Sequence, residues 1–61
     1  MAATHMRIQN VIIYKRYVRD LLFTEDQLKV VFIGGRAQVF KLEYVPSQDE
    51  IAAYESELED R

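Results

Sequence analysis

Hydrophobic and polar residues alternate most clearly in the middle of the chain. Two β-rich runs, residues 28–33 and 36–44, flank a pair of glycines at 34–35. Glycine readily adopts the positive φ angles of a type I′ turn, so the two runs are predicted to form a β-hairpin. The apolar residues that share one face of the returning strand are Phe40, Leu42 and Tyr44. Another segment of the chain must therefore pack against that apolar face to remove it from water.

The predicted cover is a C-terminal helix over residues 48–60. Pro46 ends the preceding strand, and Ser47 with Glu50 three residues later has the pattern of a capping box. After this cap, apolar residues recur at intervals of three and four and form one narrow stripe, made of Ile51, Tyr54 and Leu58. We interpret the stripe as part of the core or of a dimer interface.

The pattern in residues 7–28 fits two different structures. Apolar residues recur at helical spacing from Ile8 to Leu22, whereas the run from Val11 to Tyr14 is β-branched and aromatic, as is typical of a strand. We favour a strand near residues 7–14, a short irregular or helical piece through Leu22, and a turn at residues 24–27. The alternative is one helix from about Ile8 to Phe23.

Both alternatives predict an α+β fold, in which a small antiparallel sheet is built on the hairpin and covered by the C-terminal helix. The residues predicted to form the core are Leu21, Leu22, Val30, Phe32, Phe40, Leu42, Ile51, Tyr54 and Leu58. The order of hairpin, Val45, Pro46 and capped helix resembles that of small phage head-completion proteins of the W type and other short hairpin-helix domains. The resemblance covers residues 28–58, implies a small accessory factor, and transfers no functional residue.

With 61 residues the chain forms one small domain. His5 and Met6 form a pair that a common cloning site leaves before a start codon, so we interpret residues 1–5 as a cloning remnant and residues 6–61 as the domain. A domain of this size buries only about 60% of the surface that its unfolded chain exposes. Because the sequence has no cysteine to form disulfides, we expect self-association, most simply as a homodimer.

The composition limits the cellular compartment and the catalytic chemistry that we expect of this protein. The sequence is 49% hydrophobic and 30% charged, without an apolar run long enough for a membrane span or a visible secretory signal, so we expect a cytoplasmic protein. Covalent catalysis requires an activated nucleophile, and the single histidine falls in the presumed remnant. The carboxylates of the predicted helix lie along one exposed face rather than converging. We therefore predict no enzyme activity, no metal and no cofactor.

Charge is segregated along the chain, which carries a net charge of −2. Seven of the eight basic residues precede residue 42, and seven of the ten acidic residues follow it. The predicted basic binding surface interleaves aromatic and cationic residues: Tyr14, Lys15, Arg16, Tyr17 and Arg19, with Arg36. The predicted acidic surface is formed by Glu55, Glu57 and Glu59. We expect a non-enzymatic interaction module that binds another protein; the alternative is a nucleic-acid-binding regulator that uses the basic surface.

Overall fold

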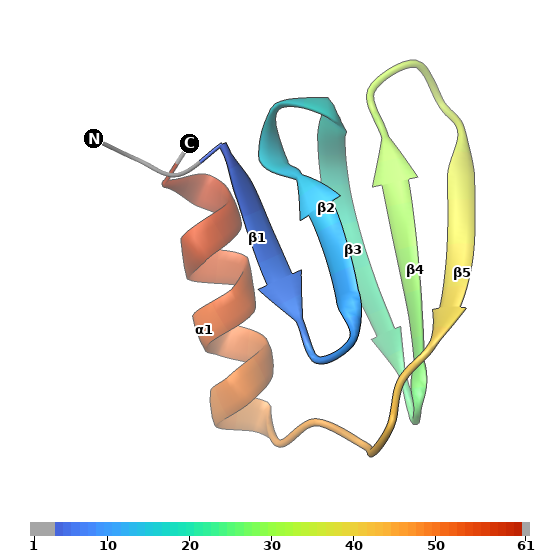
Figure 1. Ribbon diagram of the computed structural model, residues 1–61, viewed down its shortest axis with the longest axis vertical. Coiled ribbons are helices and arrows are strands. Elements are labelled where there is room, and N and C mark those ends of the chain that lie inside the picture. The colour runs from blue at the N-terminus through green and yellow to red at the C-terminus, as the bar shows by residue number, and fades with distance from the viewer. Residues whose placement is uncertain (1–3, 61) are drawn as a thin grey trace.

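Antiparallel strands form two sheets in the computed structural model, which describes residues 4–60. The elements in chain order are β1 (His5–Ile8), β2 (Val11–Tyr14), the 3-10 helix η1 (Lys15–Tyr17), β3 (Val18–Thr24), β4 (Gln27–Phe32), β5 (Ala37–Lys41) and α1 (Gln48–Glu59). One sheet has the order β1-β2 and the other the order β3-β4-β5. In Figure 1, α1 lies beside β1 on one side of the molecule, and β5 lies on the opposite side. The predicted α+β class is confirmed.

The N-terminal segment forms a hairpin rather than the single strand predicted for residues 7–14. Ile8 pairs with Val11, and Gln9 in the intervening turn has a φ of 55°. The alternative prediction of a helix from Ile8 to Phe23 is wrong. The short helical piece exists as η1, but the chain returns to strand geometry at Val18 instead of continuing irregularly through Leu22. The turn predicted at residues 24–27 is confirmed, since Thr24 pairs with Gln27.

An irregularity in β3 explains why its inward and outward residues were hard to predict. The register with β4 shifts between Val18 and Asp20, as it does at a β-bulge. After this shift, Leu21 is buried and Leu22 is 47% exposed on the opposite face. The prediction that Leu22 belongs to the core is therefore wrong.

The central hairpin is confirmed, with a loop that differs from the predicted two-residue turn. The main-chain N–H of Gly35 donates to the oxygen of Phe32 at 3.1 Å, which places Ile33 and Gly34 at the centre of the turn. The φ angles of Gly34 and Gly35 are 106° and 95°. A positive φ at the second central residue is the signature of a type II turn, and it requires glycine there.

The core lies between the sheets and the inner face of α1. Its buried residues are Met6, Ile8, Val11, Ile13, Val18, Leu21, Leu28, Val30, Leu42 and Leu58. Phe23, Phe32, Phe40 and Tyr54 are partly buried against them. The α1 helix packs beside β1 and against β3, where the rings of Phe23 and Tyr54 stack with centroids 5.9 Å apart. Tyr44, predicted to share the face of Phe40, lies beyond β5 and is 51% exposed. Neither helix within residues 4–60 is long and apolar enough to cross a membrane.

Candidate interaction surface

Aromatic rings and one guanidinium gather at the end of β2 and on η1. The ring of Tyr14 lies edge-on to two others, with centroid distances of 5.8 Å to His5 and 6.4 Å to Tyr17. The Arg16 Cζ atom lies 6.0 Å from the centroid of the Tyr17 ring. We call Tyr14, Arg16 and Tyr17 the aromatic–arginine cluster; His5 borders it but belongs to the segment that we interpret as a cloning remnant.

The local backbone explains why these side chains meet. Side chains alternate along β2, so Tyr14 points outward while Ile13 is buried. His5 is the direct partner of Tyr14 in the β1–β2 ladder and therefore lies on the same face. The η1 turn then returns Tyr17 to this side of the molecule. Tyr14 and Tyr17 remain 59% and 58% exposed, which leaves their rings available to a partner.

Lys15, predicted to belong to the basic surface, is buried instead. It is only 3% exposed, and its Nζ donates to the main-chain oxygen of Asp60 at 3.3 Å. In a 3-10 helix, residues three apart lie on the same side, and the residue three beyond Lys15 is the fully buried Val18. The ammonium group therefore meets the C-terminal end of α1 rather than a binding partner.

The other two predicted cations lie away from the cluster. Arg19 is on β3 and lines a cleft of about 310 Å³ beside α1. Arg36 is the last residue of the β4–β5 loop and lines a shallow hollow of about 520 Å³ with Phe32, Ala37 and Gln38. The structure thus brings together Tyr14, Arg16 and Tyr17, and it distributes the remaining predicted basic residues over three separate places.

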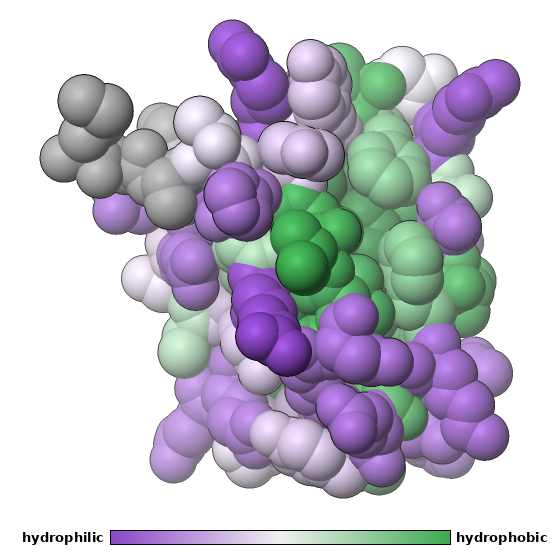
Figure 2. All heavy atoms as spheres, viewed as in Figure 1, coloured by the Kyte–Doolittle hydropathy of each residue, from purple (hydrophilic) through white to green (hydrophobic). Residues whose placement is uncertain are grey.

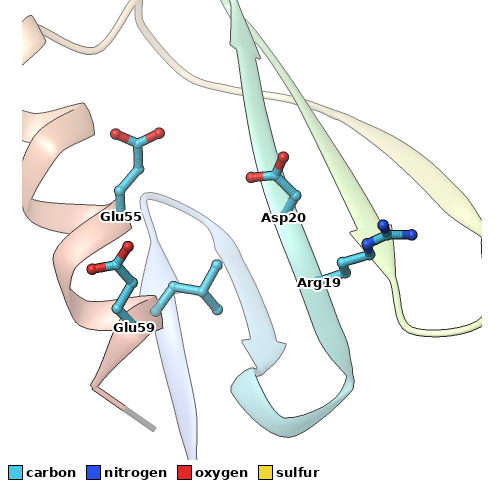
Figure 3. A pocket seen from close by; sticks show the side chains of 5 residues that line it. Arg19, Asp20, Glu55 and Glu59 are labelled. Atoms are coloured by element: carbon cyan, nitrogen blue, oxygen red, sulfur yellow. The ribbon is translucent and has the colours of Figure 1, made fainter.

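The predicted acidic residues are divided in the same way. Glu55 and Glu59 line the cleft beside Arg19 and Asp20, whereas Glu57 is exposed outside it. Figure 3 shows the Arg19 guanidinium extending toward the β4 side, away from the carboxylates on α1. Within residues 4–60, no group of three or more histidine, aspartate or glutamate side chains is arranged to hold a metal ion.

The helix residues predicted for the core or a dimer interface are used within the chain. Leu58 is buried, and Tyr54 stacks on Phe23. Ile51 is half-buried on the same side of α1. The apolar stripe of the helix therefore covers its own sheet, and a dimer interface would have to lie elsewhere.

Gln9 fixes the connection to α1, a role that the sequence did not indicate. Its Oε1 accepts from the main-chain N–H groups of Glu43 at 2.7 Å and Tyr44 at 3.3 Å, and its Nε2 donates to the Tyr44 oxygen at 3.0 Å. An amide side chain can imitate a backbone group in this way because it carries both an acceptor and donors. The only local signal was a glutamine beside Asn10 in a polar break between two apolar runs.

The start of α1 forms the predicted capping box, and the Tyr44 hydroxyl joins it by donating a hydrogen bond to Glu50. Ser47 Oγ accepts from the N–H of Glu50, and Glu50 Oε1 accepts from the N–H of Ser47. Glu50 Oε2 also accepts from the Tyr44 hydroxyl at 2.8 Å. The bond from the Ser47 N–H, followed by the one from Tyr44, lowers the pKa of Glu50 below its ordinary value of 4.5. The same carboxylate raises the pKa of Tyr44 above 10.0.

We expect the Glu50 network to make stability depend on pH in the acidic range. Because the pKa of Glu50 is lower in the folded than in the unfolded state, its stabilisation is complete above about pH 4.5 and is lost as the pH falls through the folded-state pKa. Urea unfolding between pH 3 and 7 should therefore show a smaller acid loss in Glu50→Gln than in the wild type. An NMR titration that places the Glu50 pKa at or above 4.5 would contradict this expectation.

Exposed aliphatic side chains are a further feature that the sequence did not locate. The most exposed are Ile12, Ile33, Val39 and Val45, at 56–65%. Figure 2 shows hydrophobic side chains gathered over the centre of the molecule and toward β4 and β5, while hydrophilic ones cover the α1 side. The sequence predicted the alternation in β5, but not that its side chains would remain uncovered.

The function is therefore inferred from the exposed residues described above. No protein family, curated protein or solved structure was found to match this chain.

Proposed function

We propose that this chain is a small, non-enzymatic cytoplasmic interaction module, homodimeric, that binds another protein through the aromatic–arginine cluster. The observation that carries the proposal is the exposure of Tyr14 and Tyr17 beside Arg16 on one face. Tyrosine and arginine are enriched among the residues that dominate binding energy in protein interfaces. The tyrosine rings also offer large contact area at little cost in conformational entropy, because each has two side-chain torsions.

A protein partner is favoured over a nucleic acid by the distribution of the cations. Binding to a phosphate backbone relies on several lysine and arginine contacts along one track. Here Lys15 is buried, Arg19 lies on β3 away from the cluster, and Arg36 is at another place on the surface. Arg16 is left as the cation beside the exposed rings, within a chain of net charge −2.

The proposal is tested by affinity capture from an extract of the source cells, using the immobilised chain. The variant Tyr14→Ser with Tyr17→Ser removes the two rings of the cluster, and Val45→Ser is the control because Val45 is a 62% exposed apolar residue outside the cluster. We expect a specific protein to be retained by the wild type and the control and to bind at least about tenfold more weakly to the double variant, the equivalent of about 1.4 kcal/mol. Equal retention by all three proteins would overturn the proposal.

The exposed rings beside Arg16 also support a second candidate, binding of single-stranded nucleic acid by base stacking. A fluorescent single-stranded oligonucleotide titrated at about 50 mM salt separates the candidates, because phosphate contacts weaken steeply as salt increases. Salt-sensitive binding that is lost in Arg16→Ala would favour the nucleic acid. Absence of binding at this salt concentration would leave the protein partner as the candidate to pursue.

A further inference from the structure

The strand β5 has one unpaired edge. It is the last strand of its sheet, and it lies on the side of the molecule away from α1 (Figure 1). The N–H of Phe32 donates to the oxygen of Arg36, and the N–H of Leu42 donates to the oxygen of Asp26. Because backbone groups alternate in direction along an antiparallel strand, residues 36, 38, 40 and 42 face β4. The N–H and C=O groups of residues 37, 39 and 41 therefore point outward from the sheet.

The side chains near this edge are also incompletely covered. Phe32 and Phe40 are only partly buried, and Gln38, on the same face as Phe40, is exposed beside the shallow hollow. On the other face, Val39 is 56% exposed. Proteins usually protect an exposed edge with central charges, proline or a bulge. At the centre of β5 there is a valine flanked by glutamine and phenylalanine.

The arrangement of side chains along β5 fits a second copy of the same strand. Val39 is the midpoint of Ala37–Lys41, so an antiparallel pairing centred there sets Ala37 of one copy opposite Lys41 of the other. This register places no like charges opposite each other, and the two lysines lie at opposite ends of the interface. It also sets Phe40 of each copy opposite Gln38 of the other, next to the hollow. A two-fold axis keeps equivalent faces together, so the two partly uncovered faces would become continuous.

We propose that two copies of this chain pair antiparallel through β5, with Val39 at the two-fold axis, to form one continuous six-stranded sheet (three strands from each copy). This inference rests on the homodimer of the proposed function and names its interface. The aromatic–arginine cluster belongs to β2 and η1, away from β5, so the dimer presents two copies of the binding surface. Bivalency of this kind raises avidity for a partner with repeated sites.

Sedimentation equilibrium of the wild type, Val39→Pro and Val39→Thr tests the interface. Proline at residue 39 removes an N–H that points outward, so it blocks pairing without removing a bond to β4, whereas threonine keeps both the N–H and the β-branched shape. We expect the wild type and Val39→Thr to approach twice the chain mass of 7.2 kDa as concentration rises, and Val39→Pro to remain at that mass. A wild type that stays monomeric up to about 1 mM, or a Val39→Pro variant that dimerises equally well, would overturn the inference.

Hydrogen exchange on the wild type provides a second measurement if Val39→Pro does not fold. The amides of residues 37, 39 and 41 should exchange more slowly at high than at low protein concentration, while the amide of Val30, within the sheet, should change little. Unchanged exchange at the three edge amides would overturn the inference. Capture of a protein through Tyr14 and Tyr17 by monomeric chain would reject the homodimer and its β5 interface but keep the cluster as a binding surface. A β5 dimer that captures nothing would reject only the cluster as a binding surface.

Discussion

Replacing Leu58 by alanine should lower the free energy of unfolding by about 2–5 kcal/mol, the range observed for truncating buried leucines. Leu58 is 6% exposed and is the buried residue of α1. Alanine has the higher intrinsic helix propensity, so the loss would come from packing and not from a weaker helix. Natural domains have about 0.05–0.15 kcal/mol of stability per residue, so this change would remove a large share of the total in a 61-residue chain.

The matched control for this prediction is Leu22→Ala. Leu22 is the same residue type but is 47% exposed on the outer face of β3, so its truncation should cost less than about 1 kcal/mol. Urea unfolding followed by circular dichroism, with all proteins at the same concentration, measures both values. If the two variants lost equal stability, the docking of α1 through Leu58 would not be a main source of stability.

The second half of the fold could be predicted because its signals are local. The glycines at 34–35, the alternation around Phe40 and the Ser47–Glu50 capping box each define a structure within a few residues. The helix, bounded at Gln48–Glu59, ends one residue before the predicted limit. None of these features depends on which distant segment packs against them.

The first half was predicted only in part, because two features interrupt the strand pattern. The turn between β1 and β2 places the non-glycine residue Gln9 at a positive φ, which no standard turn sequence announced. The shift between Val18 and Asp20 then breaks the period of two, so that the buried residues Val18 and Leu21 are three apart. The buried residues Val11, Val18 and Leu21 therefore follow one another at intervals of seven and three, as on one face of a helix, although the backbone is extended.

The candidate surface was predicted only in part for a related reason. Sequence proximity grouped Tyr14, Arg16 and Tyr17 correctly because they are joined by a single short turn. It could not show that the same turn directs Lys15 into the interior, or that Arg19 and Arg36 lie on different parts of the surface. The exposed edge of β5 was not located either, since the order of strands in a sheet is set by long-range pairing.

The buried lysine leads to the second large prediction, that Lys15→Ala should lower the free energy of unfolding by about 2–4 kcal/mol. Truncation removes a buried hydrocarbon stem, at about 0.8 kcal/mol per methylene, and also the donor to the Asp60 oxygen. The last turn of α1 contains no basic residue, and Glu59 and Asp60 lie at its end. Lys15 therefore supplies, from η1, the positive charge that stabilises a helix C-terminus.

Lys15→Met separates these two contributions, because methionine retains most of the stem and lacks the ammonium. We expect it to lose about 1–2 kcal/mol, since the Asp60 oxygen and the end of the helix dipole remain without their cation. Lys29→Met is the matched control: Lys29 is exposed on β4, so its change should stay within about 0.5 kcal/mol. Urea unfolding gives the three values, and hydrogen exchange at the last turn of α1 should accelerate in both Lys15 variants but not in Lys29→Met. If Lys15→Met proved as stable as the wild type, the lysine would act through its hydrocarbon stem and not as a cap for α1.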